Sequence, residues 1–213
     1  MTLFRPRVAI AAIAIAATIP GAASAQRSDS YTWKLGLNVG MMAYQTVGNL
    51  QTTIVPTAGA HFLIMARRGG LMFGIDEGIG TNEKATDNVL FNDLRRYQAV
   101  LMAFPATGSV EPYFGGGAGI LQVVGPRVDH QVVIDPVQQA NVLADAKERS
   151  ATGFLTLLGG VQGRWKRFTV FAQYQVTTSP SDDKLIHGAT QTLLGGLRIG
   201  LGSAREGVTA GGY

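Results

Sequence analysis

Three histidines are the residues of this sequence best suited to proton transfer: His61, His130 and His187. A two-residue turn between positions 67 and 70 would place His61 opposite Asp76 on the next strand. A histidine oriented by a carboxylate is the arrangement of a general base. No serine is expected near this pair, and both side chains would face a closed interior. The pattern therefore favours a structural hydrogen bond over catalysis.

A second cluster precedes His187 and contains Ser179, Ser181, Asp182 and Asp183. Serine, histidine and a carboxylate are the parts of a nucleophilic triad. Both serines lie in a polar loop, however, and no serine follows His187 within two residues. Two aspartates without a dedicated loop are typical of a solvated tip and not of a Ca²⁺ site. The sequence predicts no catalytic, cofactor-binding or metal-binding residue, and no cofactor.

Composition and charge limit the classes of protein that can hold these residues. The 213 residues include 28 glycines, 8 prolines and no cysteine, which favours an all-β chain with many turns and excludes disulfides and thiolate metal sites. Residues 1–25 have the layout of a cleaved signal peptide, with Arg5 and Arg7, an apolar stretch over 8–19 and Ala23-Ser24-Ala25 before Gln26. An apolar stretch of about 12 residues is too short for a membrane anchor.

Removal of the signal peptide leaves 16 basic and 14 acidic residues, a net charge of +2. No basic stripe with interleaved aromatic residues is present, so no nucleic-acid partner is expected. Nothing after residue 25 approaches 18 consecutive apolar residues. The expected domains are the signal peptide 1–25, a β-barrel over 26–201 and a tail over 202–213.

Apolar residues recur with period two in eight segments after residue 25. Such long alternation is typical of tilted transmembrane strands. The segments cover 33–43, 53–67, 71–80, 95–104, 111–123, 151–165, 168–178 and 190–201. Short connections alternate with long polar ones near 45–52, 81–93, 125–150 and 178–189. The sequence therefore predicts an eight-stranded antiparallel up-and-down transmembrane β-barrel with its long loops at the outer end.

The two faces of the predicted strands differ in polarity. One face is nearly free of charge, so it is expected to contact lipid, and charge at Leu37 is expected to cost more stability than charge at Asn38. The other face is expected to form a polar network in the lumen; its members are Lys34, Asn38, His61, Asp76, Gln173 and Arg198. Lys34 and Arg198, on strands that must pair, are expected to contact Asp76 or Glu111. Trp33, Trp165 and Phe168 are expected to form an aromatic girdle at the periplasmic rim.

One segment departs from the strand pattern. Asp135-Pro136 followed by VQQANVLADAKER predicts an N-cap, a proline at the first helical position and about three turns of helix in the third outer loop. Val137, Ala140 and Ala144 would form one weak apolar stripe. A disordered loop is the alternative.

At EPYFGGGAGI (111–120) and LTLLGGVQGRW (155–165) the chain resembles the small outer-membrane β-barrels, opacity-protein-like and OmpA/OmpX-like. Gly115, Gly117 and Gly119 would leave space inside a narrow barrel for long side chains such as Lys34, Arg198 and Gln173, and Gly116 would let the wall bend. The resemblance implies an exported outer-membrane protein with outer-membrane lipids as partners. Its outer loops would contact lipopolysaccharide or other surface components.

The resemblance implies a non-enzymatic role in envelope integrity, surface interaction or adhesion. Alternatives are a lipid A deacylase- or acyltransferase-like enzyme and a small-solute channel. The expected packed lumen disfavours the channel.

Overall fold

A computed structural model describes residues 30–66, 68–106, 108–165, 167–178 and 183–205. Its elements are β1 (Ser30–Thr46), β2 (Asn49–Met65), β3 (Gly69–Thr86), β4 (Val89–Ala103), β5 (Val110–Val124), β6 (Arg127–Val128), α1 (Pro136–Glu148), β7 (Ala151–Trp165), β8 (Phe168–Thr177) and β9 (Ile186–Arg205). The predicted signal peptide, Ser179, Ser181, Asp182 and the tail from residue 206 lie outside the described residues.

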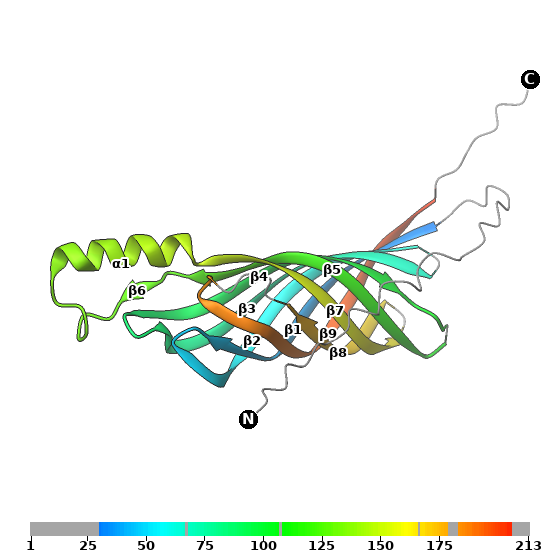
Figure 1. Ribbon diagram of the computed structural model, residues 1–213. Coiled ribbons are helices and arrows are strands. Elements are labelled where there is room, and N and C mark those ends of the chain that lie inside the picture. Colours follow the sequence, from blue (N-terminus) through cyan, green and yellow to red (C-terminus); the bar gives the residue numbers. More distant parts are fainter. Residues whose placement is uncertain (1–29, 67, 107, 166, 179–182, 206–213) are drawn as a thin grey trace, which may run out of the picture.

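Eight long strands form a closed antiparallel barrel, in which each strand pairs with its neighbours in chain order. The first and last strands, β1 and β9, pair along most of their length, with Leu37 opposite Leu197, and this pairing closes the wall. The short β6 pairs only with the end of β4. The predicted eight-stranded up-and-down barrel is confirmed (Figure 1). Within the described ranges, no helix is long and apolar enough to cross a membrane.

The two ends of the barrel differ in their connections. At the short-turn end lie the connections around residues 66–68, 104–109 and 166–167. At the opposite end, called the arm end, lie the β1–β2 turn, the β3–β4 turn and the segment 125–150. This segment, called the arm, carries β6 and α1 and extends beyond the barrel wall (Figure 1). Of the long connections predicted at this end, the segment 125–150 is present, whereas β1–β2 and β3–β4 are joined by two-residue turns.

The expected polar loops at 45–52 and 81–93 are wrong, because the strands continue through both segments. β1 and β2 are joined only by Val47-Gly48, and β3 and β4 only by Asp87-Asn88. The Thr46 hydroxyl donates to Lys84 O at 2.7 Å, and Gly48 N donates to Ala85 O at 2.9 Å. These bonds tie the two hairpins together at the arm end, where both continue as strands with shifts in register.

The predicted helix is confirmed, but its buried face is not the expected one. Asp135 Oδ1 accepts a hydrogen bond from Val137 N at 3.2 Å and caps α1, which begins at Pro136. Val137 is exposed, and so are Ala140 and Ala144. Ala146 is buried instead, in an apolar cluster of the arm end. The last turn, next to β7, packs onto the barrel, whereas the first turn projects away.

The last strand is longer than expected, since β9 continues past Leu201 to Arg205. A register shift in the β1–β9 pairing places Trp33 opposite Gly202 and Lys34 opposite Gly200. Gly202 adopts a φ of 147°, a backbone conformation that favours glycine. This bulge interrupts the alternation of side chains at the point where the predicted strand ends.

Candidate functional site

The outer wall of the barrel is an apolar belt of exposed side chains. Leu37 is 65% exposed and Leu157 is 72% exposed, and similar residues surround the barrel on every strand. Burying such a surface in water-free lipid is favourable, whereas a monomer in water rarely exposes so large an apolar patch. The wall therefore has the surface of a membrane-spanning barrel.

Aromatic side chains lie at the short-turn edge of this belt. The predicted girdle residues Trp33, Trp165 and Phe168 all point outward at the short-turn end, where Trp165 pairs with Phe168 across the β7–β8 hairpin. Tyr97 and Tyr174, which the sequence analysis did not single out, are half-exposed further toward the arm end. Amphipathic rings favour the membrane–water boundary, so Trp33, Trp165 and Phe168 mark the short-turn edge of the belt.

A charged pair forms the centre of the lumen. Asp76 on β3 and Arg96 on β4 are directly opposite each other, and both side chains are buried. Asp76 Oδ2 accepts hydrogen bonds from Arg96 Nη2 at 2.8 Å and Nε at 3.1 Å, while Oδ1 accepts from Asn38 Nδ2 at 2.7 Å. Gln98 Nε2 donates to the same carboxylate at 3.2 Å. The carboxylate is thus satisfied by groups on two other strands, β1 and β4.

From this centre, hydrogen bonds cross the barrel to the opposite wall. Arg96 Nη1 donates to Thr192 Oγ1 on β9 at 2.9 Å. Gln98 bonds to Gln175 on β8, and Gln175 Nε2 donates to Thr156 Oγ1 on β7 at 2.8 Å. The cavity beside this network has a volume of only about 10 Å³. The middle of the lumen is therefore closed to solutes.

A second buried cation, Arg198, lies nearer the short-turn end. Its Nε donates to His61 Nε2 at 2.8 Å and its Nη1 donates to Gln162 Oε1 at 2.8 Å. The guanidinium carbon lies 4.0 Å from the centre of the Phe171 ring, a cation–π geometry. Gly36 separates His61 from Arg198 in the same cross-strand row, and a Cβ there would collide with the imidazole. The missing side chain lets the two residues meet.

The two polar groups are continuous. His61 Nδ1 lies 3.5 Å from Asn38 Oδ1, and Asn38 reaches Asp76. Toward the short-turn end, Gln162 Nε2 donates to Glu111 Oε2 at 2.9 Å, and Glu111 forms an ion pair with Arg164. A chain of side chains therefore runs along the lumen and joins strands on all sides, which holds the closed barrel in one register.

The structure places all six predicted lumen residues inside, but it pairs them differently than expected. The expected contact of Lys34 or Arg198 with Asp76 or Glu111 is wrong: among the described residues, Asp76 pairs with Arg96 and Glu111 with Arg164. Lys34 Nζ instead donates to Thr169 Oγ1 at 3.4 Å. Gln173 Oε1 accepts from the Tyr113 hydroxyl at 3.2 Å.

The sequence analysis did not identify Arg96 as a lumen residue and gave His61 the wrong partner. Arg96 alternates with Gln98 on the inward face of β4, a period-two signal that would have identified it. His61 is opposite Gly74, not Asp76, because the turn begins two residues earlier and pairs Met65 with Gly70. A two-residue offset keeps every side chain on its face but changes its partner.

The lumen is less polar than expected. An apolar cluster closes its arm end and a second one lies toward the short-turn end, because a narrow barrel must be filled to solid density by its own side chains. The first is built around Met42, Phe91 and Leu94, and the second around Leu63, Val100 and Leu158.

The glycine-rich strand β5 gives the second cluster its room. A Cβ at Gly117 would collide with the β4 backbone at Ala99, and one at Gly115 would meet Val100 at 2.9 Å. The predicted role of these glycines is thus seen next to Val100 and Leu158, and not next to Lys34, Arg198 and Gln173 as expected. A Cβ at Gly116 would make ordinary contacts.

Most residues of the alternative catalytic cluster near His187 lie outside the described residues. His187 is opposite Gln45 near the arm end, half-buried, and the two serines lie outside the described residues. In the ranges that the structure describes, no three His, Asp or Glu side chains cluster closely enough to hold a metal ion.

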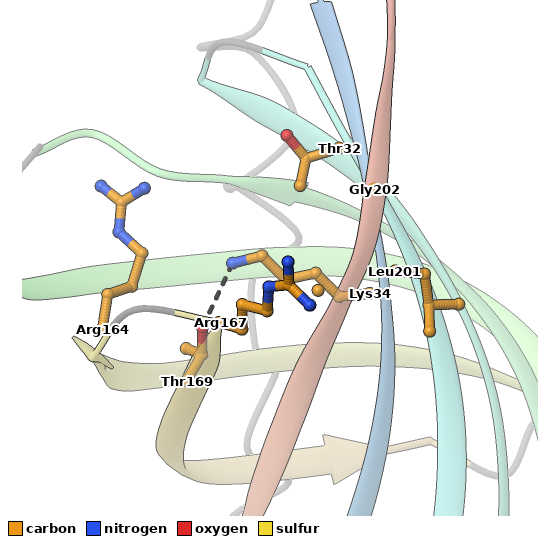
Figure 2. A pocket seen from close by; sticks show the side chains of 8 residues that line it. Thr32, Lys34, Arg164, Arg167, Thr169, Leu201 and Gly202 are labelled. Atoms are coloured by element: carbon orange, nitrogen blue, oxygen red, sulfur yellow. Dashed lines mark hydrogen bonds between the residues drawn. The ribbon is translucent and has the colours of Figure 1, made fainter.

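A basic cavity of about 460 Å³ opens at the short-turn end (Figure 2). Its lining includes Lys34, Arg164, Arg167 and Thr169, together with Leu201 at the edge of the apolar belt. In Figure 2 the head groups of Lys34, Arg167 and Thr169 lie together, and the dashed line marks the Lys34–Thr169 bond.

No protein-family model matches this sequence, and no curated protein matches it significantly. Among solved structures, neisserial surface protein A (NspA) aligns with a TM-score of 0.56 at 13% identity, over 78% of this chain and 96% of that chain. The N-terminal β-barrel domain of Pseudomonas aeruginosa OprF aligns with a TM-score of 0.47 at 6% identity, over 78% of this chain and 97% of that one. Ail of Yersinia pestis aligns with a TM-score of 0.47 at 14% identity, over 81% and 100%. The fold is that of the small eight-stranded outer-membrane β-barrel proteins.

Proposed function

We propose that this protein is a non-enzymatic integral outer-membrane barrel, exported through the periplasm, that acts through its arm end in surface interaction. In this orientation the short-turn end faces the periplasm and the arm end faces outward. The observation that carries the proposal is the contrast between a lumen closed by its own side chains and an arm that extends past the wall. The closed lumen argues against a solute channel.

The arm has a surface suited to contact with other molecules. Ile134 is 81% exposed, Val137 is 69% exposed and Val132 is 54% exposed, all in the first turn of α1 or just before it, and outside the apolar belt. Exposed apolar clusters of this kind mark interaction sites. Lipopolysaccharide and other envelope components remain the expected partners.

Attachment of whole cells tests this function. Cells that produce the protein should partition into hexadecane droplets more than cells that lack it. The variant Ile134→Ser/Val137→Ser should lose this gain, whereas Gln131→Ser/Gln138→Ser, on the same arm, should keep it. Heat-modifiable migration on a gel should be the same for all three proteins. Equal attachment by both variants would reject the arm as the acting surface.

An enzymatic role is tested separately. Lipid A from cells with and without the protein should have the same mass spectrum, since the proposed function includes no change to the lipid. Loss or gain of one acyl chain would replace the proposed function with a lipid-modifying one.

A further inference from the structure

The basic cavity at the short-turn end holds more positive charge than the described residues neutralise. Lys34, Arg164 and Arg167 line it, and the buried Arg198 lies behind it close enough to repel Lys34. Glu111 is the carboxylate that acts on Lys34 from nearby, and it already pairs with Arg164. In the described part of the chain this end therefore carries an unbalanced group of cations.

Lys34 is the most informative member of this group. It is 6% exposed, and its ammonium group forms a 3.4 Å hydrogen bond to Thr169 but no ion pair with any described residue. Burial of an ammonium group without a counter-charge is costly. The cost falls when an anion enters the adjoining cavity and accepts hydrogen bonds from the ammonium group.

The other lining groups fit an oxyanion. The Arg164 side chain is 47% exposed although one of its nitrogens bonds to Glu111, so its other donors are accessible. Arg167, in the β7–β8 turn, is exposed and lies beside Lys34 in Figure 2. Guanidinium groups bind phosphate oxygens in two-pronged geometry, and an ammonium group adds a point charge.

The position of the cavity at the edge of the apolar belt indicates that the phosphate belongs to a lipid. Leu201, 58% exposed, is part of both the cavity lining and the apolar belt, and Trp33 and Trp165 lie at the same rim. A phosphate in the cavity could thus be joined to acyl chains that lie on the outer wall. Basic pockets next to a membrane surface are suited to anionic lipid head groups.

We propose that Lys34, Arg164 and Arg167 form a phosphate-binding site for the head group of an anionic phospholipid. The site would hold a lipid of the periplasmic leaflet, an orientation that rests on the proposed function. Free phosphate shares the same chemistry, so the experiment has an arm for each source.

Quenching of tryptophan fluorescence by brominated lipid provides the first arm. The two tryptophans of the chain both lie at this rim, so they report on lipid bound there. In mixed bilayers, brominated phosphatidylglycerol should quench more than brominated phosphatidylcholine at equal mole fraction. Arg167→Gln should reduce this preference by about 10-fold, the effect of losing one hydrogen bond between charged groups.

Arg68→Gln is the matched control, because Arg68 is exposed in another turn of the same end and does not line the cavity. It should keep the full preference. Lys34→Met, which removes the charge but keeps most of the side-chain volume, should lose it in the same way as Arg167→Gln. Since both leaflets of the test bilayer have the same composition, the result does not depend on which end faces outward or on the function of the arm.

The second arm is calorimetric titration of the detergent-solubilised protein with inorganic phosphate. Binding that Arg167→Gln abolishes, together with a lipid preference near one, would assign the site to free phosphate and overturn the lipid source. Equal lipid preference in Arg167→Gln and Arg68→Gln, with no phosphate binding, would overturn the site itself.

Discussion

Replacement of Asp76 by alanine tests whether the central ion pair holds the barrel together. The change removes the carboxylate that accepts from Arg96, Asn38 and Gln98. Arg96 has no exposed side-chain area, so its charge would remain in the lumen with Thr192 as its other side-chain hydrogen-bond partner.

The expected loss is about 3–5 kcal/mol in the free energy of unfolding, the usual cost of removing one partner from a buried pair. The lost bonds of Asn38 and Gln98 add little, because the space vacated, joined to the adjacent cavity of about 10 Å³, admits a water molecule that bonds to both amides.

Urea unfolding in lipid vesicles, followed by tryptophan fluorescence, measures this loss. Asp145→Ala is the matched control, because Asp145 pairs with Arg149 at 3.4 Å on the arm, outside the apolar belt, where 65% of its side chain is exposed. It should shift the urea midpoint far less. Asp76→Leu/Arg96→Met should recover most of the stability that Asp76→Ala loses, since no buried charge remains. Equal shifts for Asp76→Ala and Asp145→Ala, or no recovery in the double variant, would refute the reasoning.

Three further predictions concern the wall, the lumen and the export of the chain. Leu37→Arg should destabilise the barrel by roughly 2–4 kcal/mol in vesicles, and Leu37→Met should not, because position 37 lies on the lipid face; equal midpoints would contradict that assignment. Asn38→Arg should also destabilise the barrel, since Asn38 is buried against a cavity of only about 10 Å³ that cannot hold the longer side chain. Planar bilayers with the reconstituted protein should show little or no conductance, and a steady large conductance would contradict the closed lumen. N-terminal sequencing of the outer-membrane fraction should begin at Gln26, and a chain that keeps Met1 or is soluble after lysis would contradict export.

Much of the wall was predictable because it depends on interactions within single strands. Lipid acts on every outward residue in the same way, so Leu35, Leu37 and Val39 carry the signal without reference to any other strand. The helix was predictable for a similar reason, since Asp135 and Pro136 act within its first turn. The side of the helix that packs was not predictable, because it depends on where the barrel wall lies.

The sequence by itself determined which residues face lipid, which face the lumen and how many strands form the wall. Only the tertiary structure decided the pairs: Arg96 with Asp76, His61 with Arg198, and Glu111 with Arg164. It also decided that the arm-end hairpins continue as strands and that apolar clusters fill part of the lumen. The physical reason is that alternation survives a shift of two residues in register, whereas the partner of each inward side chain is set by the stagger of the strands and the closure of the barrel.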